Sequence, residues 1–152
     1  MAPLAVRPLI DESWNLVAID EKSSAVEFSN LVSAEVCVVG NADRLVQVFV
    51  NLLRNALNAV ELGGSIEVRS RRFERAGETW IAIAVDDNGP GIQVEVLPEI
   101  FDAFVTTRLD SRGTGLGLTV AEGIVTQHGG TIQASNRAEG GARLEVVLPG
   151  AK

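Results

Sequence analysis

The spacing of hydrophobic residues predicts a long amphipathic helix near the middle of the chain, over residues 42–61. Apolar side chains recur there at intervals of three and four residues, which places them on one face of a helix. They are Leu45, Val48, Phe49, Leu52, Leu53, Ala56, Leu57 and Val60. Asn41 or Asp43 can cap the first turn, and the glycines at 63 and 64 are typical of a helix end.

Shorter apolar runs predict strands on both sides of this helix. Each run is alternating or rich in branched residues, and the runs lie at residues 25–29, 35–39, 65–73, 79–85, 131–135 and 142–148. Their spacing predicts three hairpins, with turns at 30–34, 76–78 and 139–141. Two further helices are expected, over 9–22 and from the glycine-rich turn at 113–118 to 127, with one helical turn over 99–104.

Three asparagines follow the apolar face of the long helix. Asn51, Asn55 and Asn58 are spaced by four and three residues and therefore share one side of the helix. Asparagine is a mediocre helix former, so a row of three invites an explanation. The row is either a solvated polar flank or a set of amide oxygens that binds a hard cation such as Mg²⁺ or meets phosphate groups.

A carboxylate closely follows the strand predicted over 79–85. Asp87 begins the sequence Asp-Asn-Gly-Pro-Gly, which must turn the backbone sharply. An ionised Asp is a hydrogen-bond acceptor only, so it suits a ligand that donates, such as the amino group of adenine. Gly89 and Gly91 leave room for a flat ring close to the backbone. On its own, however, Asp-Asn-Gly-Pro is also an ordinary turn sequence.

Residues 105–118 supply candidates for phosphate binding. Positions 105–114 are polar and unpatterned, which predicts a mobile lid. The glycine-rich turn at 113–118 then opens a helix, and free N–H groups and the helix dipole at such a start bind anions. Its spacing fits neither the Rossmann pattern nor a Walker loop. His128, the only histidine, is interpreted as a helix-end residue that bonds to nearby carbonyls.

Composition narrows the function classes. A chain of 152 residues, 46% of them hydrophobic, can bury one substantial core, so a single domain over 1–152 is predicted. The net charge of −7 argues against a nucleic-acid surface, and no apolar run has the length of a membrane span. With only two lysines, phosphates would be neutralised by arginine, backbone N–H groups and a metal ion. Cys37, the single cysteine, is expected in the core.

Four segments together resemble the N, G1, F and G2 boxes of the catalytic, ATP-binding domain of sensor histidine kinases. In chain order they are NLLRNALNA at 51–59, DNGPGI at 87–92, FDAFVTTR at 101–108 and GTGLGL at 113–118. This domain belongs to the superfamily of gyrase, Hsp90, histidine kinases and MutL. The resemblance implies the Bergerat fold, an α+β two-layer sandwich in which about three helices cover one face of a mixed sheet, with ATP between the helices and the lid.

The resemblance also implies roles for individual residues. Asn55 would bind Mg²⁺, and Asn51 and Arg108 would act at the phosphates. Asp87 would accept a hydrogen bond from the adenine amino group. The other residues expected to border the nucleotide are Asn58, Gly89, Gly91, Ile92, Thr107, Gly113, Thr114, Gly115, Leu116, Gly117 and Leu118.

The implied activity is transfer of the ATP γ-phosphate to a histidine on a separate dimerisation domain, in a two-component system with a response regulator. Hydrolytic members of the superfamily carry a glutamate where this chain has Asn51, and an amide is a poor base, so independent ATP hydrolysis is disfavoured. Arg54 also stands where some histidine kinases have an acidic residue. The alternative is a nucleotide-sensing or protein-interaction module of the same fold without phosphotransfer.

The surroundings of the domain follow from the same resemblance. The chain is expected to be the catalytic part of a longer kinase whose dimerisation and phosphoacceptor domain lies elsewhere, so it should not phosphorylate itself alone. A cytoplasmic location is implied, in a parent kinase that can be anchored in the inner membrane. The domain itself is expected to contact neither membrane nor nucleic acid.

Overall fold

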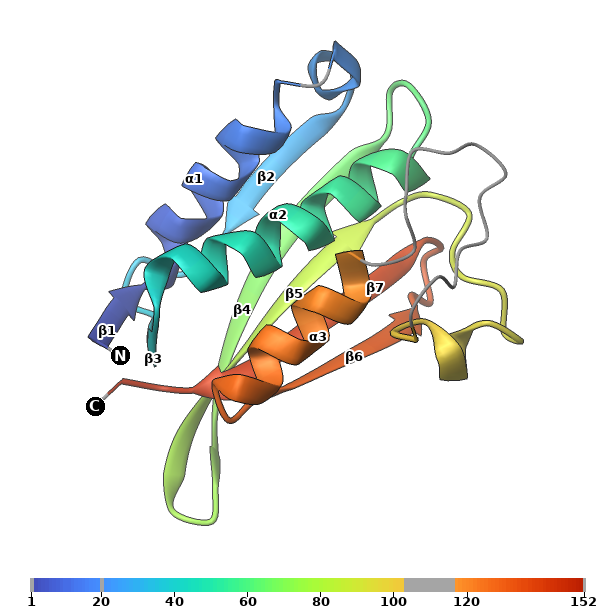
Figure 1. The fold of residues 1–152 in the computed structure, drawn as a ribbon. Helices are drawn as coiled ribbons and strands as arrows, with labels where there is room; N and C mark the ends of the chain where they lie inside the picture. Colours follow the sequence, from blue (N-terminus) through green and yellow to red (C-terminus); the bar gives the residue numbers. More distant parts are fainter. Residues whose placement is uncertain (1, 20, 103–116, 152) are drawn as a thin grey trace.

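The computed structural model of this protein describes residues 2–19, 21–102 and 117–151, and its helices cover one face of a mixed sheet (Figure 1). In chain order the elements are β1 (Ala2–Ala5), α1 (Val6–Val17), η1 (Glu21–Ala25), β2 (Glu27–Leu31), β3 (Cys37–Gly40), α2 (Ala42–Ala59), β4 (Ser65–Arg75), β5 (Glu78–Asp87), η2 (Leu97–Glu99), α3 (Gly117–Gln127), β6 (Thr131–Asn136) and β7 (Ala142–Pro149). Five strands form the sheet in the order β2-β4-β5-β7-β6. The predicted α+β two-layer sandwich is therefore confirmed.

Strand β5 is the centre of this sheet, between β4 and β7. Both neighbours run antiparallel to it, and the register places Val68, Val85 and Leu144 side by side on three adjacent strands. Alternate residues of a strand face the same side of the sheet, and these three are buried beneath the helices. The same alternation carries Asp87, two residues after Val85, to the helix-covered face.

Helix α2 lies between α1 and α3 and supplies much of the core (Figure 1). The apolar residues predicted to share its inner face are all buried, and each large side chain contributes about 1.5 to 3 kcal/mol to folding. Asn41 caps the helix as predicted, since its Oδ1 accepts a hydrogen bond from the Arg44 N–H at 3.0 Å. The helix ends at Ala59, two residues before the predicted end.

His128 closes helix α3, in agreement with its interpretation as a helix-end residue. Its Nδ1 donates to the Ile124 carbonyl at 2.9 Å, while its Nε2 accepts from the Asn41 N–H at 3.1 Å. Because Nε2 accepts a hydrogen bond, the ring is the neutral tautomer with its proton on Nδ1. The buried imidazole thus joins the end of α3 to the start of α2.

The hairpin predicted from residues 25–29 and 35–39 is wrong. Strand β2 pairs in parallel with β4, and β3 pairs antiparallel with β1, a strand that the sequence did not predict. The Asn30 amide donates to the Arg7 carbonyl and to Asp11, so the end of β2 is bonded to α1 and not to β3. An alternating pattern of apolar residues predicts a strand but does not indicate which strand it pairs with.

The other two predicted hairpins are confirmed. Strands β4 and β5 are longer than expected and join at a tip where Ala76 and Gly77 have positive φ angles of 53° and 79°. This hairpin extends beyond the helices (Figure 1). Strands β6 and β7 pair antiparallel at the far edge of the sheet. Helix α1 spans Val6–Val17, whereas residues 9–22 were predicted.

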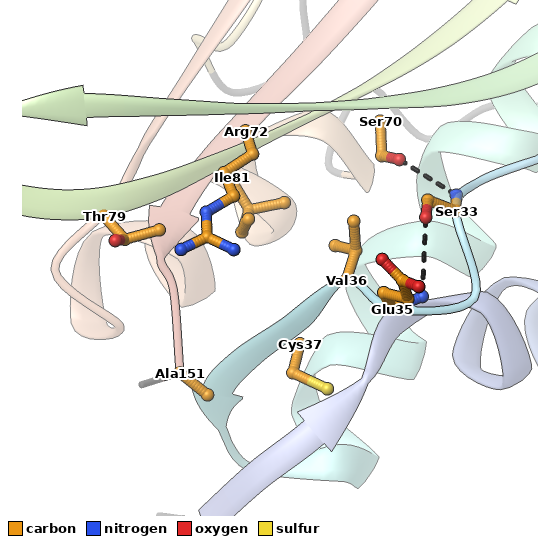
Figure 2. A pocket seen from close by; sticks show the side chains of 9 residues that line it. All are labelled: Ser33, Glu35, Val36, Cys37, Ser70, Arg72, Thr79, Ile81 and Ala151. Atoms are coloured by element: carbon orange, nitrogen blue, oxygen red, sulfur yellow. Dashed lines mark hydrogen bonds between the residues drawn. The ribbon is translucent and has the colours of Figure 1, made fainter.

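Cys37 is half-buried and not part of the core, contrary to expectation. It lines a cavity of about 270 Å³ whose walls also come from β4, β5 and the C-terminal segment (Figure 2). The lining residues are Ser33, Glu35, Val36, Cys37, Ser70, Arg72, Thr79, Ile81 and Ala151. None of them is a predicted site residue. Among the described helices, none is long and apolar enough to span a membrane.

Candidate functional site

Asp87 is the last residue of β5 and lies buried, with 3% of its surface exposed. Its Oδ1 accepts hydrogen bonds from the backbone N–H groups of Gly89 at 2.9 Å and Ala142 at 3.3 Å. Two donors on one oxygen fix the orientation of the carboxyl group. A buried, oriented acceptor at the end of a strand is the geometry required to recognise a donor group on a ligand.

The turn after Asp87 passes between the end of α2 and the β6–β7 hairpin. A Cβ atom on Gly89 would lie 2.6 Å from the Ala59 carbonyl oxygen, so only glycine fits against the last turn of the helix. Gly91 has a φ of +84°, which favours glycine, and a Cβ there would lie 2.8 Å from Oδ1 of Asn136. The two glycines allow this backbone to lie close to both neighbours.

The three asparagines lie half-buried on α2, on the side that faces α3 and the Asp87 turn. Asn51 Nδ2 donates to the carbonyl oxygen of Gly117, the first residue of α3, at 3.0 Å. Asn55 and Asn58 lie one and two turns further on, toward Ala59 and the Asp87 turn. At 1.5 Å per residue, about 12 Å of helix separates Asn51 from Ala59. The row therefore connects the start of α3 with the Asp87 turn.

The start of α3 is held by a second contact. Thr119 Oγ1 donates to the Phe101 carbonyl at 2.7 Å, and the half-buried Phe101 packs against the core. Gly117 and Leu118 thus begin a helix whose N-terminus lies beside Asn51. A helix N-terminus beside amide side chains is a suitable environment for an anion.

Several predicted site residues lie outside the described part of the chain. They are Thr107, Arg108, Gly113, Thr114, Gly115 and Leu116, together with the lid expected over 105–114. Their roles stay predictions.

The chemistry of the described site fits a nucleotide with a hard cation. In the described ranges there is no group of three or more His, Cys, Asp or Glu residues that could hold a metal ion. Asn55 instead offers an amide oxygen, a hard ligand of the kind that Mg²⁺ accepts while keeping several waters. A buried acceptor at one end and amide groups beside a helix N-terminus at the other match the base and phosphate ends of a nucleotide.

Two residues that contact this site were not predicted. Asn136, at the end of β6, and Arg137, which follows it, both bond to the backbone of the 87–92 segment. In the sequence they precede the turn at 139–141 and carry only a turn signal. No local pattern indicates a partner more than forty residues earlier in the chain.

The other face of β5 carries a separate ion pair. Asp86 accepts two hydrogen bonds from Arg143, at 2.7 Å to Nε and 2.9 Å to Nη2. The hydrogen bond to Asp86 raises the pKa of Arg143 above its ordinary value, and desolvation opposes this only in part. Asp86 and Asp87 are consecutive, so their side chains point to opposite faces and serve different partners.

Similarity to known proteins agrees with the geometry. Over 142 residues the chain is 37% identical to the sensor histidine kinase ZraS of Klebsiella oxytoca, covering 93% of this chain and 30% of that protein. The mycobacterial sensor histidine kinase MprB superposes with a TM-score of 0.86 at 27% identity and covers 97% of each chain. A nucleotide-free catalytic domain of the histidine kinase ThkA superposes with a TM-score of 0.83 at 28% identity, over 97% of this chain and 94% of that one.

The alignments delimit what these relatives share with this chain. The chain spans 30% of the length of ZraS, so the similarity concerns one part of that kinase. Residues 40–152, which include α2, the Asp87 turn and α3, match the family described as Histidine kinase-, DNA gyrase B-, and HSP90-like ATPase. The chain therefore belongs to this ATPase family and has its Bergerat fold, as its four sequence boxes predicted.

Proposed function

We propose that this domain binds ATP with Mg²⁺ and presents the γ-phosphate to a histidine on the dimerisation domain of a longer two-component sensor kinase. The observation that carries the proposal is the arrangement around α2. An oriented carboxyl group, Asp87, lies near its C-terminal end, and the Asn51 amide bonds to the start of α3 about 12 Å away along the helix axis. This spacing suits a nucleotide that lies along the helix.

Each part of the site has a role in this proposal. Asp87 accepts a hydrogen bond from the adenine amino group, and Gly89, Gly91 and Ile92 border the base. Asn55 holds Mg²⁺, which neutralises phosphate charge and orients the γ-phosphate when bound. The remaining phosphate contacts are proposed for Asn51, Asn58, Thr107, Arg108 and Gly113, Thr114, Gly115, Leu116, Gly117 and Leu118, by position in the family boxes.

Phosphoryl transfer, and not hydrolysis, is the activity expected of this site. The side chain at position 51 is an amide, which is too weak a base to take a proton from water at neutral pH, and its nitrogen donates to the Gly117 carbonyl. Transfer through a loose transition state needs mainly alignment and charge stabilisation. The acceptor histidine comes from the parent kinase, and the phosphate then passes to a response regulator.

The setting of the domain is part of the proposal. Residues 1–152 form one catalytic domain of a cytoplasmic kinase portion, and the parent can be anchored in the inner membrane. The domain contacts neither membrane nor nucleic acid. The net charge of −7 supports the second point, because nucleic-acid surfaces are basic.

Binding is tested by thermal unfolding with millimolar ATP and Mg²⁺, since a ligand that binds only the folded state raises the melting temperature. Asp87→Asn should abolish this rise, because the new amide group brings a donor to the adenine amino group. The matched control is Asp86→Asn on the other face of β5, which should lower the unliganded melting temperature but keep the rise with ATP. An unchanged melting curve of the wild type with ATP would contradict the proposal.

Transfer is tested by adding the histidine-bearing dimerisation domain in trans with ATP labelled at the γ-phosphate. Label on the histidine supports a kinase, and Asp87→Asn should prevent it. Binding of ATP without any transfer would instead indicate a nucleotide sensor of the same fold.

A further inference from the structure

We propose that Asn136 and Arg137, on the β6–β7 hairpin, are positioning residues that hold the base-binding segment 87–92 in its binding conformation. The inference rests on the proposed function, since it concerns the same nucleotide site. Neither side chain belongs to a sequence box of the family resemblance. Both act on the backbone of the segment and neither is proposed to touch the nucleotide.

Asn136 fixes the end of the segment. Its Oδ1 accepts from the Ile92 N–H at 2.7 Å, and its Nδ2 donates to the Ile92 carbonyl at 2.8 Å. One amide side chain thus satisfies both backbone groups of a residue 44 positions earlier, as a neighbouring strand would do. This close approach requires Gly91, because a Cβ there would lie 2.8 Å from Oδ1 of Asn136.

Arg137 fixes the start of the segment. Its Nη1 donates to the backbone carbonyl of Asp87 at 2.9 Å. The β5–β7 ladder ends at the pair Asp86 and Arg143, so Asp87 lies one residue beyond the pairing with β7, although it still pairs with Ile66 of β4. The guanidinium therefore supplies a hydrogen bond that β7 does not.

The Arg137 side chain is held tightly in this position. Only 15% of it is exposed, and Nη2 donates to Glu139 at 3.0 Å. Its Nε atom is buried and has no hydrogen-bond partner within the described residues. Burying an unpaired N–H group is unfavourable, so this conformation is maintained by the other contacts of the side chain.

The same hairpin also orients the carboxyl group of Asp87, because the Ala142 N–H donates to its Oδ1 at 3.3 Å. Asn88 is also bonded to Ser65 of β4, through its N–H at 3.3 Å and its Oδ1 at 2.8 Å, so the segment is held at its start by β4 and the hairpin and at its end by Asn136. A segment that is ordered before the nucleotide arrives loses little conformational freedom on binding, which increases affinity. It also keeps the acceptor at one position, where adenine presents an amino group and guanine presents a carbonyl.

The experiment measures ATP and GTP dissociation constants for the wild type, Asn136→Ala and Gln133→Ala. Gln133 lies on the same strand, and its exposed side chain makes no hydrogen bond or ion pair within the described part of the chain. Asn136→Ala should weaken ATP binding about tenfold, the effect of losing two modest hydrogen bonds. It should weaken GTP binding less, so the preference for ATP falls, while Gln133→Ala matches the wild type.

A second pair of variants tests the contact of Arg137 with the Asp87 carbonyl. It also tests the inference if Asn136→Ala does not fold. Arg137→Met should weaken ATP binding and lower the preference for ATP over GTP. Arg137→Lys can still donate to the Asp87 carbonyl and should therefore restore most of the ATP affinity and most of the preference. Wild-type constants in Asn136→Ala or Arg137→Met would overturn the inference. Equal losses for ATP and GTP, with a lower unliganded melting temperature, would overturn it too, because they indicate a purely structural role. If the wild type binds neither nucleotide, the proposed function itself fails.

Discussion

The two ends of strand β5 are built differently. At the Asp87 end, the turn is held by hydrogen bonds with Asn136, Arg137 and Ala142. At the Thr79 end, a cavity of about 270 Å³ opens among polar side chains (Figure 2). The Arg72 guanidinium on its wall makes no ion pair or hydrogen bond within the described residues.

The comparison shows that the cavity and the preorganised hydrogen-bond acceptor lie at opposite ends of β5. The two ends are eight residues apart, which is about 26 Å along a strand. A ligand at the Thr79 end would have to order exposed side chains, and each such ordering opposes binding. At the Asp87 end, the acceptor is already fixed by backbone N–H groups.

The largest effect is expected from adding a side chain at Gly141, where the β6–β7 hairpin lies against Asp87. A Cβ at Gly141 would lie within 2 Å of the Asp87 carbonyl oxygen, and the residue has a φ of +89°. Gly141→Ala should therefore lower the free energy of unfolding by about 3 kcal/mol or more and remove ATP binding. Denaturant unfolding and calorimetry measure both quantities.

The matched variant at the other end is Gly77→Ala. Its φ is +79°, but no atom lies within 4 Å of a Cβ placed there. Only the backbone conformation opposes the substitution, so a loss of about 1 kcal/mol is expected, with ATP affinity unchanged. Similar losses in the two alanine variants would show that the packing of Gly141 against Asp87 is unimportant.

An intermediate effect is expected from the ion pair on the outer face. Arg143→Met would leave Asp86, 2% exposed, without its partner, and should lower the free energy of unfolding by about 2 kcal/mol. Folding raises the pKa of Arg143, and a cation of this kind stabilises the fold at every pH below its unfolded pKa. That stabilisation is lost only far above neutral pH. Arg143→Met should therefore lower the free energy of unfolding by the same amount at pH 6 and at pH 9.

The smallest effect is expected from Arg72→Ala. Since the guanidinium is exposed and without a partner among the described residues, stability should change by no more than about 0.5 kcal/mol. The ATP dissociation constant should equal that of the wild type. A tenfold weaker affinity in Arg72→Ala, measured by calorimetry, would mean that the two ends of β5 are coupled.

Much of the fold is predictable because its signals are local. The apolar spacing of α2, its Asn41 cap and the β4–β5 and β6–β7 hairpins all depend on residues close in sequence. The pairing of β2 with β4 joins residues far apart, for example Phe28 with Ile66, and no local pattern specifies it. The strand β1 was missed for the same reason, since its partner is β3.

The candidate site also contains residues with a local sequence signal and residues without one. Asp87 and the asparagine row could be predicted as candidates because a carboxylate before a glycine turn and a periodic row of amides are visible in the sequence. Asn136 and Arg137 were not predicted because they bond to backbone groups of Ile92 and Asp87, which any sequence would present. The chemistry of a ligand contact is encoded in side-chain identity, whereas the support of a loop depends on the assembled fold.

The adjacent carboxylates of β5 have one more consequence. Slippage of β5 by a single position would turn Asp87 outward toward Arg143 and send Asp86 inward beneath the helices. In such a misaligned sheet Asp87 would face Arg143 in place of Asp86, while Asp86 would take the place of Val85 among buried apolar side chains. The ion pair alone therefore does not distinguish the two registers, and the unfavourable burial of a carboxyl group at the place of Val85 opposes the shift.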